Sequence, residues 1–123
     1  GMGSYKSFVI KADARREVYL QKLLTLLDAH GIEYKCGTAA TAKGYNYATA
    51  KEETFSVTSA DVVINTAQAN AALVQVLFEP RTKLADSATY DITAWSLPYA
   101  YGLHAYATKE RVVQGANWKP SSM

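Results

Sequence analysis

Residues suited to catalysis or metal binding are few in this sequence, and most of them lie between positions 30 and 36. His30 and Glu33 have the His-x-x-Glu spacing with which several zinc hydrolases hold their metal. A catalytic zinc site needs three protein ligands, however, and His104 is the only other histidine. We therefore interpret His30 as a cation near the negative end of a helix dipole, and we expect neither a metal site nor a cofactor in this chain.

Cys36 is the only cysteine, so the chain can form no internal disulfide. Its thiolate could act as a nucleophile with His30 or His104 as the base. Cys36 also alternates with Ile32 and Tyr34, as a small buried hydrophobic residue in a strand does. We favour the buried residue and expect no catalytic residues; a small hydrolase that uses Cys36 is the weaker alternative.

Aromatic side chains concentrate in one stretch near the C-terminal end, residues 89–102, which holds a tryptophan and three tyrosines. Such rings combine apolar area with a polar tip, which suits a core, a contact with another domain, or the stacking of a sugar or peptide. The sequence leaves these three roles open. The candidate ligand or domain-contact residues are Tyr90, Asp91, Trp95, Tyr99, Tyr101 and Tyr106.

The elements before this stretch follow from hydrophobic spacing. Residues 7–11 form a continuous apolar run, which predicts a strand buried on both faces. Residues 15–30 have helical spacing, and Gly31 supplies the left-handed residue that ends a helix. The helix presents one apolar stripe, formed by Leu20, Leu23, Leu24 and Leu27. Residues 32–36 then alternate as a strand does, so we expect a strand–helix–strand unit with a right-handed crossover.

Residues 37–51 are small and polar apart from two tyrosines, and predict an exposed hairpin or loop. Strands are expected at 54–57 and 61–64, and a second helix at 69–78 that Pro80 stops. The order β-α-β-β-β-α predicts an α+β two-layer sandwich followed by the aromatic segment. In that segment Pro98 suits the start of a short helical turn and Gly102 its end. We place one domain at 5–107 and a tail or linker at 108–123.

Charge and hydrophobicity indicate whether nucleic acid or a membrane is an expected partner. The formal net charge is only +2, and no clustered run of Lys and Arg is present, so we expect no nucleic-acid partner. No apolar run reaches the roughly 18 residues that a membrane helix needs, so we expect no insertion into a membrane.

Three consecutive segments carry a family resemblance: VQVLFEP at 74–80, the spacer RTKLADS at 81–87 and YDITAWSLPYAYG at 90–102. Together they resemble the segment downstream of the catalytic domain in large, exported, zinc carboxypeptidase A-like metallopeptidases of Bacteroidetes. The likeness extends more loosely to residues 8–11 and 30–32. One departure is Gln68-Ala69, where that family often has Gln-Pro before the second helix.

The resemblance implies a non-catalytic accessory domain of a secreted or periplasmic protein. Its partner would be the upstream catalytic domain of the same polypeptide, which this domain packs against or assists, and that catalytic domain would hold the zinc. The alternative is a free-standing module that binds a glycan or peptide through the aromatic stretch.

Overall fold

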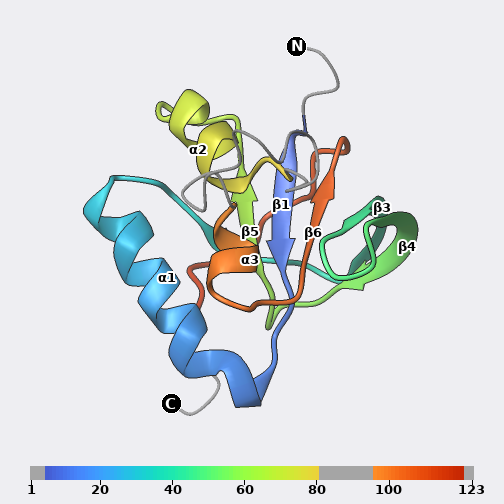
Figure 1. Cartoon of the computed structure of the whole chain (residues 1–123), viewed down its shortest axis with the longest axis horizontal. Coiled ribbons are helices and arrows are strands. Elements are labelled where there is room, and N and C mark those ends of the chain that lie inside the picture. The colour runs from blue at the N-terminus through green and yellow to red at the C-terminus, as the bar shows by residue number, and fades with distance from the viewer. Residues whose placement is uncertain (1–4, 81–95, 121–123) are drawn as a thin grey trace, which may run out of the picture.

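The structure is a computed structural model that describes residues 5–80 and 96–120 (Figure 1). Its elements confirm a mixed α+β fold. In chain order they are β1 (Ser7–Ile10), the 3-10 turn η1 (Ala14–Arg16), α1 (Glu17–Ala29), β2 (Lys35–Cys36), β3 (Ala40–Asn46), β4 (Lys51–Val57), β5 (Val62–Asn65), α2 (Ala71–Phe78), α3 (Leu97–Ala100) and β6 (Ala105–Thr108).

Within the described residues the strands form one six-stranded sheet in the order β2-β5-β1-β6-β3-β4, and every neighbouring pair is antiparallel. Because β5 runs antiparallel to both β1 and β2, those two strands point the same way without touching. The expected strand–helix–strand unit is therefore present in split form, with β5 between its two strands.

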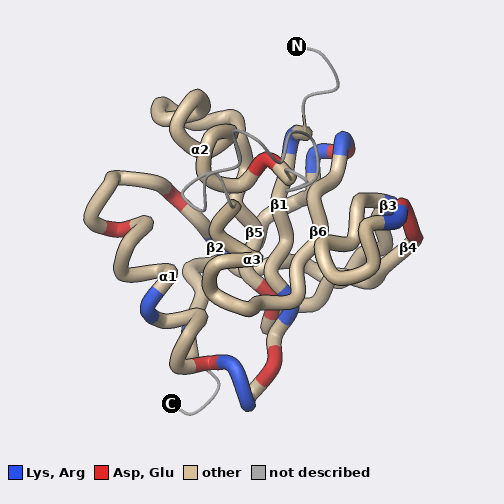
Figure 2. The backbone as a smooth tube through the Cα atoms, in the orientation of Figure 1, with Lys and Arg blue, Asp and Glu red and all other residues tan. Residues whose placement is uncertain are grey.

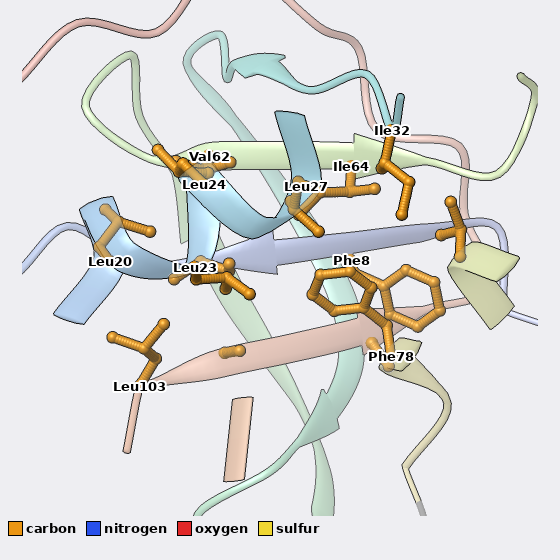
Figure 3. Close-up of a cluster of buried hydrophobic side chains, with 14 of the residues drawn as sticks. Phe8, Leu20, Leu23, Leu24, Leu27, Ile32, Val62, Ile64, Phe78 and Leu103 are labelled. Carbon is orange, nitrogen blue, oxygen red and sulfur yellow. The ribbon is translucent and has the colours of Figure 1, made fainter. Parts of the chain in front are cut away.

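The helix-side face of the sheet carries the larger core. Phe8 and Ile10 of β1 are fully buried there, under the leucine stripe of α1 and Phe78 of α2 (Figure 3). Because side chains alternate along a strand, Val9 points to the opposite face, where it too is fully buried. The prediction of a strand buried on both faces is confirmed.

Helix α1 matches its sequence signals closely. All four leucines of the predicted stripe are buried. The side chain of Asp13 accepts a hydrogen bond from the backbone N–H of Arg15, which caps the turn η1 ahead of the helix. At the other end Gly31 has a φ of 69°, and the N–H of Ile32 donates to the carbonyl of Leu27 at 2.9 Å. This is a Schellman arrangement, and it confirms that Gly31 supplies the left-handed residue that ends the helix.

Strand β2 is shorter than the predicted strand at 32–36. The N–H of Ile32 closes the helix cap, and the N–H of Glu33 donates to the side chain of Gln68. These two donors are therefore not available to a β-ladder, and pairing begins at Lys35.

The second face of the sheet is also covered. Residues from the hairpin β3–β4 pack there against residues from β1, β5 and β6, in a cluster of Val9, Ala42, Phe55, Val57, Val63, Tyr106 and Val112. The prediction of an exposed hairpin or loop at 37–51 holds for residues 39–41 and 48–51, which are exposed, but alternate residues of β3 are buried. Tyr47, just after β3, is only 3% exposed.

Strand β6 was not expected from the sequence. It pairs with β1 along four residues and with β3 at two, so it joins the hairpin to the rest of the sheet. The helix-side residues of β6 are Ala105 and Ala107, which are small and have a low intrinsic preference for strands. The hydrophobic pattern of the sequence therefore did not reveal this strand.

Residues 109–120, which we call the C-terminal strap, correct the predicted tail at 108–123. The N–H of Val112 donates to the hydroxyl of Ser7. The strap then runs along the outer edge of β2, where the N–H of Gly115 donates to the carbonyl of Cys36 at 2.7 Å. Finally, the indole N–H of Trp118 donates to the carbonyl of Ala60. The folded unit therefore continues to residue 120, and the strap covers an otherwise open sheet edge.

Candidate functional site

Three tyrosines, Tyr45, Tyr47 and Tyr99, meet where the hairpin, α2 and α3 come together. Together with the nearby Tyr5 we call them the tyrosine cluster. The Tyr47 ring makes edge-on contacts with two of the others, at centroid distances of 5.9 Å to Tyr45 and 5.3 Å to Tyr99. The hydroxyl oxygens of Tyr45 and Tyr99 lie 3.4 Å apart. Edge-on contact is a favoured arrangement of aromatic rings, so these side chains support one another.

Tyr47 anchors the cluster. Its hydroxyl donates to the backbone carbonyl of Phe78, the last residue of α2. Carbonyls at a helix C-terminus have no partner within the helix, and Pro80 prevents α2 from continuing. The Tyr47 N–H donates to the carbonyl of Ala105 at 3.1 Å. Tyr47 therefore ties the hairpin to both α2 and β6.

The short helix α3 sets the position of Tyr99. Pro98 lies in its first turn, and Gly102 follows it with a φ of 65°. The N–H of Leu103 closes the end by donating to the carbonyl of Pro98 at 2.9 Å. The helical turn expected between Pro98 and Gly102 is thus present, and it fixes the backbone from which the Tyr99 ring reaches Tyr45 and Tyr47.

Tyr5 completes the cluster from the start of β1. Its ring centroid lies 6.2 Å from that of Phe8, and its carbonyl accepts a hydrogen bond from the side chain of Gln75 on α2. The Nζ of Lys109 lies 5.8 Å from the Tyr5 ring centroid, within the range of a cation–π contact.

Burial and nearby groups raise the pKa values of Tyr5, Tyr47 and Tyr99 and so keep these three phenols neutral. Burial raises the pKa of Tyr47 well above its ordinary value, and the neighbouring Tyr99 and Glu79 add to that effect. Burial also raises the pKa of Tyr99, with a second contribution from its hydrogen bond to Tyr45. In Tyr5 the pKa rises through burial and then through Glu52 and Glu79. A general base needs a pKa near the working pH, so these hydroxyls are suited to hydrogen bonding rather than to proton abstraction.

Of the six sequence candidates, the structure describes Tyr99, Tyr101 and Tyr106. Tyr90, Asp91 and Trp95 lie outside the described residues. Tyr99 belongs to the tyrosine cluster, and Tyr101 is partly buried against the helix-side core.

The position of Tyr106 corrects the expectation that it is a ligand or domain-contact residue. Its ring lies on the opposite face of the sheet, is 7% exposed and stacks on Phe55 at a centroid distance of 3.9 Å. The side-chain N–H of Asn46 lies 3.5 Å from its hydroxyl. Because strand alternation turns Tyr106 away from Ala105 and Ala107, it belongs to the second core cluster and is not part of a contact surface with Tyr99.

His30 and Cys36 each make a contact that accounts for their position. His30 uses its Nδ1 on the carbonyl of Leu26 at 2.9 Å, at the end of α1, where a cation or donor is favoured. Cys36 is partly buried in β2, beneath Gly115 of the strap. Within residues 5–80 and 96–120, no group of three or more His, Cys, Asp or Glu side chains is placed to hold a metal ion.

Sequence reasoning missed Tyr5, Tyr45 and Tyr47 as members of the site. A signal was present, because Tyr45 and Tyr47 are spaced by two residues, which is the period of one strand face. The small and polar residues around them favoured a solvated loop instead.

Charged residues are dispersed along the part of the chain that the structure describes. Figure 2 shows Lys and Arg interspersed with Asp and Glu along the described backbone, without a long run of either sign. None of the described helices is both long and apolar enough to cross a bilayer. No protein-family model matches the chain, and none of the curated proteins or solved structures compared with it matches either.

Proposed function

We propose that this chain is a non-catalytic accessory domain whose tyrosine cluster contacts another domain of the same polypeptide. On the resemblance of segments 74–80 and 90–102, the parent is a secreted or periplasmic zinc carboxypeptidase-like protein, and the contacted domain is its upstream catalytic domain. The zinc belongs to that upstream domain, and this chain packs against the upstream domain or assists it.

The observation that carries the proposal is the placement of Tyr45 and Tyr99. Both rings are partly buried and rest on the fully packed Tyr47, so their orientation is fixed before any partner arrives. Rigid aromatic side chains with a polar tip lose little conformational entropy on binding, which is why they are frequent at contact surfaces.

The resemblance and the geometry point to the same part of the molecule. The described residues of the resembling segments form α2 and α3, and these helices carry Phe78 and Tyr99 to the cluster. Tyr5 lies beside them, so a domain joined to the chain ahead of β1 would emerge next to the same surface.

A titration of this chain against the separately produced upstream domain tests the proposal. We expect saturable binding, and we expect Tyr99→Ala to weaken it by about tenfold or more, because aromatic residues at the centre of a contact dominate its energy. The matched control is Val113→Ala, which trims a residue that is 65% exposed on the strap. Absence of binding, or equal weakening by both variants, would refute the proposal.

A free-standing glycan- or peptide-binding module is the second candidate, because the same partly buried tyrosine rings could stack on a sugar or hold a peptide. Titration with a panel of oligosaccharides and short peptides separates the two. Binding to one of them that depends on Tyr99, without binding to the upstream domain, would favour the module.

A further inference from the structure

We propose that Tyr45 and Tyr99 are an oxidative cross-linking site, at which a one-electron oxidant joins β3 to α3 through a dityrosine bond. The inference does not rest on the domain contact proposed above, but a domain seated on the tyrosine cluster would shield the same rings, so the cross-link forms when the cluster is uncovered. It starts from the 3.4 Å separation of the two hydroxyl oxygens, which belong to residues 54 positions apart in the sequence.

The chemistry needs two neighbouring phenols and an oxidant. A haem peroxidase with hydrogen peroxide removes one electron and one proton from each ring, and peroxide is reduced to water. The two phenoxyl radicals then couple through ring carbons next to the hydroxyl-bearing carbons. The proton on each coupled carbon then moves to the ring's oxygen, which restores both phenols, so the product has two hydrogen atoms fewer than the two tyrosines.

The arrangement of the cluster selects this pair. In a phenol, the carbons that couple are separated from the oxygen by a single ring carbon, so adjacent hydroxyls bring the reactive carbons close. Tyr45 and Tyr99 are both only partly buried, which leaves them within reach of an oxidant. Tyr47 lies between them but is 3% exposed, and its hydroxyl proton is held by the carbonyl of Phe78.

The elements that carry the pair favour coupling within one molecule. Tyr45 sits in β3, which is held by β4 on one side and β6 on the other. Tyr99 sits in α3, which holds its hydroxyl oxygen 3.4 Å from that of Tyr45 before any oxidant acts. The bond would close a long loop, and a cross-link of that kind stabilises a fold chiefly by restricting the unfolded chain.

The test is to oxidise the dilute chain with hydrogen peroxide and a haem peroxidase, then to digest it and analyse the peptides by mass spectrometry. We expect a monomer that has lost two hydrogen atoms, dityrosine fluorescence, and a cross-linked pair of peptides containing Tyr45 and Tyr99. The oxidised monomer should also melt at a higher temperature than the untreated chain.

Three variants and one condition make the test decisive. Tyr45→Phe and Tyr99→Phe should each abolish the intramolecular product, whereas Tyr19→Phe should retain it, because Tyr19 lies on the outside of α1 and is 46% exposed. Oxidation in concentrated urea should remove the preference for the pair. A cross-link that survives Tyr99→Phe, products that join only separate chains, or the same pattern in urea would overturn the inference.

Discussion

At the scale of single residues, Tyr47 explains why the cluster has a fixed shape. The side chain fills the space between α2 and the hairpin, and its hydroxyl satisfies a carbonyl that the end of α2 leaves without a partner. A buried carbonyl without a donor costs about 1–3 kcal/mol, so this single hydroxyl matters to the fold as well as to the surface above it.

The raised pKa of Tyr47 predicts how stability depends on alkaline pH. A phenol whose pKa is higher in the folded state than in the unfolded state contributes stability that is fully present below its unfolded pKa. That contribution disappears as the pH rises through the folded pKa. Stability should therefore be flat through neutral pH and should fall above about pH 10, where tyrosines of the unfolded chain ionise.

Tyr47→Phe tests this dependence. The variant should be less stable at neutral pH, because the Phe78 carbonyl loses its donor, and its stability should fall less steeply above about pH 10, because the buried phenol is gone. Urea unfolding followed from neutral to alkaline pH measures both effects. Equal alkaline slopes for the variant and the original chain would show that burial of Tyr47 does not control the dependence.

At the scale of elements, α1 was predictable because its signals are local. The leucine spacing, the cap at Asp13 and the Gly31 stop all lie within the segment that folds. Strand β6 and the burial of Tyr47 were not predictable in this way, because both depend on contacts with strands far along the chain. Ala105 and Tyr47, for instance, meet through a hydrogen bond that no local pattern indicates.

The packing of α1 gives a direct mutational test. Leu27 is fully buried, so Leu27→Ala should reduce the free energy of unfolding by about 2–5 kcal/mol, as truncation of a buried leucine does. Lys22 is exposed on the same helix, so Lys22→Ala should have little effect. Chemical denaturation of the two variants checks the difference, and equal losses would mean that the stripe does not face the sheet.

The strap offers a sharper comparison between adjacent residues. Val112 is 5% exposed in the second core cluster, whereas Val113 is 65% exposed. Val112→Ala removes two buried carbon atoms and should cost about 1.6 kcal/mol from lost burial alone, plus a cavity contribution. Val113→Ala should be nearly neutral. If thermal unfolding showed the two variants to be equally stable, the strap would not be part of the folded unit.

At the scale of the whole molecule, the α+β class followed from the sequence, but the domain boundary and the position of the site did not. The boundary at 107 failed because residues 109–120 are polar and gain order from β2 and Ser7 rather than from their own pattern. The candidates Tyr99 and Tyr106 do not share one site, because Tyr99 of α3 packs on the helix-side face of the sheet and Tyr106 of β6 packs on the opposite face.

Hydroxyl-radical footprinting of the tyrosine rings, in this chain alone and in the same chain inside its parent protein, measures whether a neighbouring domain covers the tyrosine cluster. We expect Tyr45 and Tyr99 to be modified in the isolated chain and protected in the parent, because the neighbouring domain covers them. Tyr19, which is 46% exposed on α1, should be modified equally in both and serves as the internal control. Equal modification of Tyr45 and Tyr99 in the two forms would contradict the account, since the tyrosine cluster would then have no covering domain.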